Sequence, residues 1–286
     1  MSNSYGVDML FIPDAPKSIQ KGQPLKNVLG LEAVDCLAHN ISHVYPEFDS
    51  KKFRGSALDN LETFEFKDRA VHIATALRLC LPSKYEKAIE VILGSLTLPN
   101  TQTEGLGLAV LFYQPHSFFV LEYGLDNKYN GGDDPFEISM RAQYELTKRN
   151  TSEFSMRPFL IQEQERTLSR LMEWTFDPDP HVRRLCSEGT RPRLPWAPRI
   201  REFIKNPAPT LPILEALKDD SSLYVRRSVA NHLGDIAKDH PKIVFDICNR
   251  WLIDASRDVK CLIRHALRHP AKKGNETALR LRSAAK

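Results

Sequence analysis

The stretch DSSLYVRRSVANH at 220–232 has two counterparts in the same chain, DPDPHVRRLCSEG at 177–189 and DASRDVKCLIRHA at 254–266. All three read Asp, four residues, Val, and then Arg or Lys. Their valines are 43 and 34 residues apart, which is within the range of helical solenoid repeats. The pattern predicts one helix per repeat: the Asp caps its start, the Val begins its buried stripe, and the basic residue lies on an open face.

Helical periodicity also runs through the rest of the chain, and strand signals are sparse. Apolar residues recur with helical spacing at 29–41, 67–81 and 85–96, and as one long helix at 158–174. Prolines separate these segments, and short links of this kind join antiparallel helices. A loop rich in Gly, Asn and Asp, NKYNGGDDP at 127–135, interrupts the pattern.

The predicted fold class is therefore all-α, a solenoid of stacked helix pairs that resembles HEAT repeats. Its inner helices would line a concave surface. We expect a single HEAT-like domain over residues 1–270, with its clearest repeats at 177–270. A basic C-terminal tail would follow at 271–286.

Charge is divided unevenly along the chain. The net charge is only +4, but residues 1–180 hold 18 Lys and Arg against 25 Asp and Glu, whereas residues 181–286 hold 22 against 11. The aligned cations are Arg183, Arg226 and Lys260 in one column, and Arg184 and Arg227 in the next. Cations at the start of each inner helix would form a basic groove that follows a phosphate backbone. The alternative is that these arginines pair with nearby acids of the repeats.

Composition argues against several other classes of protein. Apolar residues make up 42% of the chain and charged residues 27%, as in soluble globular proteins. No run approaches the ~18 apolar residues of a membrane span, and the N-terminus lacks the layout of a secretory signal. Five scattered cysteines without a CxxC pair argue against a disulfide framework and a zinc ribbon. We expect a cytoplasmic protein with no membrane partner.

Common metal and cofactor motifs are missing from the sequence. His39 and His43, like His265 and His269, are four residues apart on predicted helices, but no third ligand accompanies either pair at a convincing spacing. There is no GxxxxGK[ST] or GxGxxG loop and no GxSxG elbow. The sequence therefore predicts no metal site, and it does not support hydride, phosphoryl or serine-acyl chemistry.

The segment SEGTRPRLPWAPR at 187–199 breaks the first repeat helix, because three prolines stop it. The segment holds three arginines, one acid, Glu188, and one large ring, Trp196. In the repeat alignment Glu188 takes the position of Asn231, which places it on the inner face. A ring in such a segment could pack beside a deoxyribose or a base and attract a cationic centre.

Three acids lie close in sequence to cations: Glu153, Glu188 and Asp235. Such acids are commonly structural salt-bridge partners. On a cationic groove they could instead stabilise a positive charge that develops on a bound nucleic acid, and position a water for attack. The residues alone leave both interpretations open.

Two longer stretches, RRLCSEGTRPRLPWAPR at 183–199 and DDSSLYVRRSVANHLGDIAKDHP at 219–241, resemble the AlkC-type DNA alkylation repair glycosylases, HEAT-like repeat proteins related to AlkD. NTSEFSMRPFL at 150–160 and FKDRAVHIATALRLCLPSKYEKAI at 66–89 fit the same family, so that the likeness covers roughly residues 20–270. The resemblance implies hydrolysis of the N-glycosidic bond of a cationic alkylated base in duplex DNA, a step of base excision repair. It implies 3-methyladenine and 3-methylcytosine as substrates, and excision without rotation of the base into a pocket.

The resemblance also implies roles for individual residues. Glu153 and Glu188 match acids that contact the sugar cation or the attacking water, Asp235 matches a further acid, and Trp196 matches the ring packed against the lesion nucleotide. With the aligned cations added, the residues expected to contact DNA or to order the acids are Arg157, Arg183, Arg184, Arg191, Arg193, Arg226, Arg227, Asn231, Lys238 and Lys260. The family implies no metal or organic cofactor, double-stranded alkylated DNA as partner, a monomer, and association with the bacterial nucleoid when bound to DNA.

Two features depart from the family pattern. Some members carry an immunoglobulin-like domain after the repeats, whereas this sequence ends in AKKGNETALRLRSAAK at 271–286, so we expect no DNA contact from such a domain. The loop at 127–135 is also longer than expected between these helices.

Two other functions fit the same groove. A non-catalytic binder of bent or branched DNA would need the cations alone, so the joint presence of the three acids and Trp196 argues against it. A HEAT scaffold for acidic proteins would be disfavoured by duplex binding that weakens steeply with salt.

Overall fold

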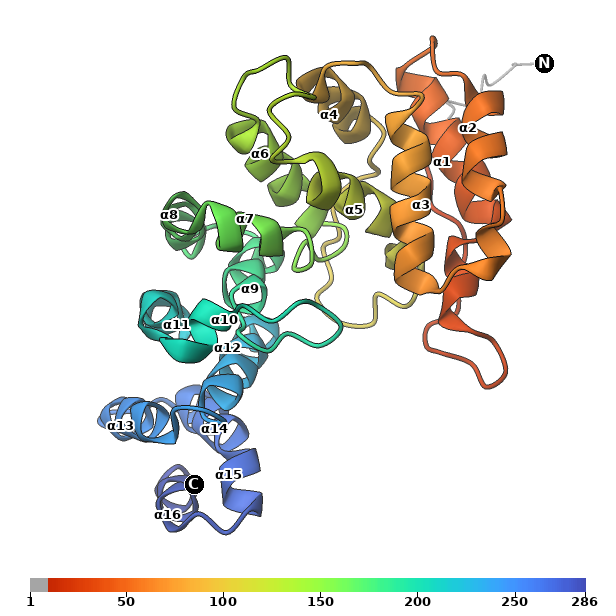
Figure 1. The fold of residues 1–286 in the computed structure, drawn as a ribbon. Coiled ribbons are helices and arrows are strands. Elements are labelled where there is room, and N and C mark those ends of the chain that lie inside the picture. The colour runs from red at the N-terminus through yellow and green to blue at the C-terminus, as the bar shows by residue number, and fades with distance from the viewer. Residues whose placement is uncertain (1–9) are drawn as a thin grey trace, which may run out of the picture. The chain divides into compact units, whose positions relative to one another are not determined.

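The computed structural model describes residues 10–286, and every regular element in that range is a helix (Figure 1). The predicted all-α class is confirmed. The chain divides into two compact units, Met1–Ser155 and Met156–Lys286. This division falls inside the range 1–270 over which we predict one domain. The two units are described separately.

The first unit packs its helices around an aromatic and aliphatic core. Helix α3 contacts both α2 and α5, while α4 contacts α1 and α6. The ring of Tyr85 stacks on Phe119 with centroids 6.1 Å apart and meets Tyr129 edge-on at 5.5 Å. The elements are η1 (Leu25–Leu29), α1 (Leu31–Val44), α2 (Ser50–Leu58), η2 (Leu61–Thr63), α3 (Phe66–Arg78), α4 (Tyr85–Gly94), η3 (Ala109–Tyr113), α5 (Gln114–Tyr123) and α6 (Phe136–Thr147).

The predicted loop at 127–135 lies between α5 and α6 of this unit. Most of its residues are exposed, but Tyr129 is buried and has the guanidinium of Arg78 3.4 Å above its ring centroid. The loop is therefore anchored to the core by an aromatic side chain and a cation–π contact.

The second unit is a stack of helix pairs. Helix α12 lies between α9 and α14, and α11, α13 and α16 form the other layer (Figure 1). The elements are α7 (Met156–Gln162), α8 (Gln164–Trp174), α9 (Pro180–Gly189), α10 (Arg201–Lys205), η4 (Ala208–Thr210), α11 (Leu211–Leu217), α12 (Leu223–Ile236), α13 (Pro241–Trp251), α14 (Arg257–Ala266), α15 (Arg268–Lys272) and α16 (Glu276–Ala284).

The three repeats correspond to α9, α12 and α14. The predicted start of the buried stripe is confirmed, since Val182, Val225 and Val259 are all buried. The predicted caps are wrong. The N-cap of α9 is Asp179, whose carboxylate accepts from the backbone N–H of His181, and α12 and α14 begin after serines.

The first two repeat aspartates instead form the turns that lead into their helices. The carboxylates of Asp177 and Asp220 accept from backbone N–H groups two residues further on, at Asp179 and Ser222. A short acidic side chain stabilises a turn in this way as well as it caps a helix, so the pattern marked the helix start but misplaced the cap.

Two other predictions about this unit need correction. The long helix at 158–174 is two helices, because the backbone of Glu163 leaves the helical region with φ −125° and ψ 47°. The stretch 271–286 is largely helix α16 rather than a plain basic tail. Its Ala278 and Leu281 are buried, and the helix packs on α13 and α14. The stack therefore continues almost to the last residue described.

Candidate active site

Helix α9 ends at Gly189, and an irregular segment, residues 190–200, follows it to α10. The buried guanidinium of Arg157 fixes both ends of this segment. From the sequence, Arg157 is among the residues expected to contact DNA or to order the acids. Nη1 of Arg157 donates to the carbonyls of Gly189 (3.1 Å) and Arg191 (2.6 Å). Nε and Nη2 donate to the carbonyl of Pro198, at 3.0 and 2.6 Å. Because Arg157 is only 1% exposed, it is out of reach of a phosphate and acts as a structural clamp.

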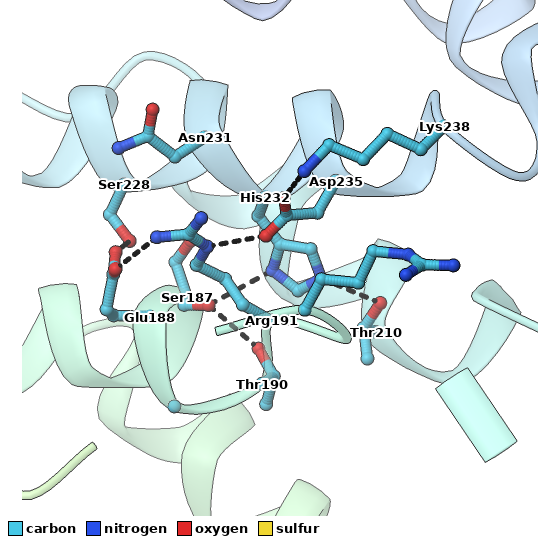
Figure 2. A network of polar contacts seen from close by, with 12 residues as sticks. Ser187, Glu188, Thr190, Arg191, Thr210, Ser228, Asn231, His232, Asp235 and Lys238 are labelled. Carbon is cyan, nitrogen blue, oxygen red and sulfur yellow. Dashed lines mark hydrogen bonds and ion pairs between the residues drawn. The ribbon is translucent and has the colours of Figure 1, made fainter. Parts of the chain in front are cut away.

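Arg191 is the centre of a buried ionic cluster. Its Nη1 lies 2.5 Å from Oε1 of Glu188 on α9, and its Nε lies 2.8 Å from Oδ2 of Asp235 on α12. Figure 2 shows the guanidinium between the two carboxylates. Oγ of Ser228 donates to the other oxygen of Glu188 at 2.6 Å, and Nζ of Lys238 donates to Asp235 at 2.8 Å. The structure thus brings two of the three predicted acids together with the predicted cations Arg191 and Lys238.

The charges of this cluster keep Glu188 ionised. Burial by itself would favour the neutral acid. The positive charges of Arg184, 3.6 Å away, and of Arg191, with the hydrogen bond from Ser228, outweigh burial and hold the pKa of Glu188 below its usual value. A buried carboxylate that remains negative can stabilise positive charge nearby.

His232 lies next to the ionic cluster, and its ring is uncharged. Its Nδ1 lies 3.0 Å from the carbonyl oxygen of Ser187, which also accepts from Oγ1 of Thr190 (Figure 2). Because a carbonyl only accepts, Nδ1 carries the proton of the neutral ring. Burial lowers the pKa of His232 to about 4, so the ring is uncharged at neutral pH.

Trp196 lies in the segment that Arg157 clamps. Its backbone has φ 63°, in the left-handed region that is uncommon for a bulky residue, and its side chain is 65% exposed. Arg193 of the same segment makes two hydrogen bonds of 2.8 Å to the carboxylate of Asp239. The segment is thus held at both ends and in its middle, with a large ring at the surface.

Glu153, the third predicted acid, belongs to the first unit, two residues before its last residue. Its Oε2 accepts from Oγ1 of Thr151 at 2.9 Å. It is half-buried, unlike Glu188 and Asp235.

Two of the aligned cations do not lie on an open face as predicted. Arg183 makes two hydrogen bonds to Asp220 of the next repeat, at 2.6 and 3.0 Å, and Arg226 pairs with Asp258 at 2.9 Å. Each arginine thus bridges its own repeat to the following one, and the alternative of pairing with repeat acids is correct for both.

The remaining predicted cations have varied surroundings. Arg184 lies near Glu188 and over the ring of Tyr224 at 4.9 Å. Arg227 is exposed, and Lys260 is half-buried.

Sequence reasoning missed several residues of this region. Ser228 is three residues before Asn231 and seven before Asp235, so the three share one face of α12. That spacing could have identified Ser228 as a partner of Glu188. The cations after α14 were also missed, and they line an open pocket with part of the cluster. Its lining residues are Arg191, Asn231, Gly234, Asp235, Lys238, Ala266, Arg268, His269 and Lys272.

Two further properties concern the described part of the chain. Residues 10–286 contain no group of three or more His, Cys, Asp or Glu side chains arranged to hold a metal ion. In the same range, no helix combines the length and apolar character needed to cross a membrane.

Comparison with known proteins identifies the family. No family model matches the chain. Uncharacterized protein YhaZ of Bacillus subtilis (strain 168) is 35% identical over 258 residues, which are 90% of this chain and 67% of that protein. The solved structure of Pseudomonas fluorescens alkylpurine DNA glycosylase AlkC, bound to DNA containing an abasic site analog, is 35% identical with a TM-score of 0.79. The match covers 92% of this chain and 69% of that one.

The second unit consists of stacked helix pairs, which is the architecture of a HEAT-like repeat protein. A buried ionic cluster lies between its successive inner helices α9 and α12. Within that class, the chain belongs to the AlkC family of DNA glycosylases, because identity, coverage and fold all agree. The resemblance that the repeat segments suggested is confirmed.

Proposed function

We propose that the protein is a monofunctional DNA glycosylase that hydrolyses the N-glycosidic bond of cationic alkylated bases in duplex DNA. The observation that carries the proposal is the pair of buried carboxylates, Glu188 and Asp235, joined by Arg191 in a member of the AlkC family. The proposed substrates are 3-methyladenine and 3-methylcytosine, and the protein would act as a cytoplasmic monomer.

The enzyme does not have to activate the base as a leaving group. When the bond from C1′ to the base nitrogen breaks, its electron pair leaves with the base, which becomes neutral, and positive charge develops on the sugar. An already cationic base needs no protonation, so no enzyme group has to reach its edge. The proposal therefore includes excision without rotation of the base into a pocket, in contrast to base-flipping glycosylases.

The acids would act on the sugar and on water. Glu188 is ionised, so its charge would stabilise the sugar cation, and water that bonds to C1′ would pass its proton to a carboxylate. A carboxylate has about four lone-pair sites. Glu188 therefore retains acceptor capacity beyond its bonds to Arg191 and Ser228. Arg191 would fix the spacing of Glu188 and Asp235, while Glu153 would supply a further carboxylate.

Trp196 would pack against the lesion nucleotide. Its exposed ring offers an apolar face that excludes water and an electron-rich face that attracts a cationic centre. The clamp at Arg157 would keep that ring in place when DNA binds.

The test is base release from methylated duplex DNA, identified by chromatography. The wild type should release 3-methyladenine and 3-methylcytosine and leave abasic sites. Glu188→Gln, which keeps the shape and removes the charge, should slow release by roughly 10² to 10⁴-fold with DNA affinity nearly intact. The matched control is Glu215→Gln on α11, whose carboxylate bonds to Trp251, and it should release base at the wild-type rate.

The alternative is a non-catalytic binder of bent or branched DNA. It is favoured by one observation, that both oxygens of Glu188 already have partners. No release above the spontaneous rate by the wild type would support it and refute the enzyme. Equal losses of affinity and release in Glu188→Gln would make Glu188 a structural partner.

A further inference from the structure

The cations after α14 differ from Arg183 and Arg226 of the aligned columns, because no acid is paired with them. Arg183 and Arg226 are neutralised by aspartates of the following repeat. In contrast, no carboxylate of residues 10–286 pairs with Arg268 or Lys272, although both are exposed and line the same pocket as His269. Positive charge that could attract an anion is therefore concentrated at this pocket.

The amide of Asn231 has a fixed orientation in this pocket. Its Oδ1 accepts from Nε2 of His265 and from Nη2 of Arg268, both at 3.0 Å. Arg268 can only donate, so the opposite orientation would set two donors against each other. The Nδ2 group consequently faces away from both, and no acceptor among residues 10–286 is bonded to it. Asn231 thus holds Arg268 at the wall of the pocket.

The acid in the pocket does not cancel this charge. Asp235 is already paired with Arg191 at 2.8 Å and with Lys238 at 2.8 Å. The pocket thus combines cations that have no acidic partner with the neutral polar side chain of Asn231, and such a lining suits a phosphate group.

We propose that this pocket, formed by Asn231, Arg268, His269 and Lys272, binds one backbone phosphate of the DNA. The proposal rests on the proposed function for the identity of the ligand. Because the pocket shares Arg191 and Asp235 with the acid cluster, the phosphate bound there belongs to a nucleotide next to the lesion. The site would fix the register of the duplex over the acids, whereas the acids perform the chemistry.

The first experiment measures binding of a duplex with a single abasic-site analogue as a function of salt. The double variant Arg268→Gln/Lys272→Gln should bind roughly tenfold or more weakly. Its slope of log affinity against log salt should be shallower by about 0.9 for each phosphate that the variant no longer neutralises. The matched control is Lys242→Gln on the outer helix α13, an exposed lysine of the same unit, which should match the wild type. A double variant with wild-type affinity and slope would overturn the proposal.

The second experiment locates the phosphate. Single neutral methylphosphonate linkages are placed one at a time around the abasic nucleotide. One position should weaken wild-type binding roughly tenfold. The same linkage should have no further effect on Arg268→Gln/Lys272→Gln, because that variant no longer binds the phosphate. Equal reductions of affinity in both proteins at every position would contradict a site at these residues.

A third variant adds a negative charge to the pocket while it keeps the fold. Asn231→Asp keeps an acceptor for His265 and Arg268, so α12 remains bonded to α14 and α15, but it replaces the neutral amide with a carboxylate that would repel a bound phosphate. It should fold with the wild-type melting temperature and bind the duplex at least tenfold more weakly. Wild-type affinity in this variant would refute a phosphate beside Asn231. Base release by the wild type is scored separately, so failure of the glycosylase and failure of the phosphate site are distinguishable.

Discussion

The two units differ in where they place acidic side chains. In residues 10–155 no Asp or Glu is buried, and ion pairs such as Arg54–Asp35 lie at the surface, with side chains 47% and 45% exposed. In the second unit Glu188 and Asp235 are buried around Arg191, and their side chains are only 6% and 4% exposed.

The physical cost of these arrangements is different. A surface ion pair loses little hydration and contributes little. A buried pair loses hydration on both partners, and apolar residues of similar volume would often be as stable or more so. The second unit therefore places acids where folding alone does not favour them. This contrast points to chemistry, and the following predictions test it from the largest effect to the smallest.

Arg191→Met should have the largest effect on stability. It removes the guanidinium shared by Glu188 and Asp235, and leaves two buried carboxylates with weaker compensation. The free energy of unfolding should fall by about 3–5 kcal/mol, as measured by urea denaturation. A decrease no greater than that of a surface variant would mean that the cluster is hydrated in solution, and the contrast between the units would disappear.

Arg157→Met should be the next most destabilising change, and Arg69→Met is the matched variant in the first unit. Arg157 and Arg69 are both buried guanidinium groups bonded to backbone carbonyls, Arg69 to those of Phe64 and Lys26 at 3.1 Å each. Replacing either by Met leaves buried acceptors unpaired and should cost about 3 kcal/mol in urea denaturation.

Base release should distinguish Arg157→Met from Arg69→Met, because of the two arginines only Arg157 clamps the segment that carries Trp196. Base release per folded molecule should fall in Arg157→Met and stay at the wild-type level in Arg69→Met. Equal activity of the folded fractions would make both arginines purely structural.

Acid should destabilise both units through buried histidines. Burial lowers the pKa of His116 in the first unit to about 3 and that of His232 in the second to about 4. The unfolded chain binds these protons below an ordinary pKa of ~6.5, whereas the folded protein does not. Stability is therefore fully present above that value and is lost as the pH falls towards the folded pKa.

From pH 7 to pH 5 each histidine should account for a decrease of about 2 kcal/mol in the free energy of unfolding. His116→Phe should remove its share of this pH dependence, as measured by urea denaturation at both pH values. An unchanged pH dependence in that variant would show that His116 is hydrated and titrates normally.

Much of this contrast could be predicted from the sequence, because the informative patterns were local. The Asp–Val–Arg spacing placed Val182, Val225 and Val259 in buried stripes, and the repeat alignment put Glu188 on an inner face. These features need only helical periodicity and the stacking of successive repeats.

The pairing of the arginines could not be predicted in the same way. Arg183 binds Asp220, 37 residues further along the chain, and that contact depends on how one helix is rotated and shifted against the next. The composition of a repeat is the same whether its arginine faces DNA or the neighbouring repeat. Likewise, nothing local distinguishes Arg157, which is buried among carbonyls, from an arginine on a basic surface.

Arg54→Met should have the smallest effect and sets the baseline for the others. Its partner Asp35 is 45% exposed, so water solvates the carboxylate when the arginine is removed, and salt already screens the pair. The urea midpoint should stay at the wild-type value in both low and high salt. A clear decrease that vanishes at high salt would show that surface charges also stabilise the first unit, and the contrast would then be one of degree.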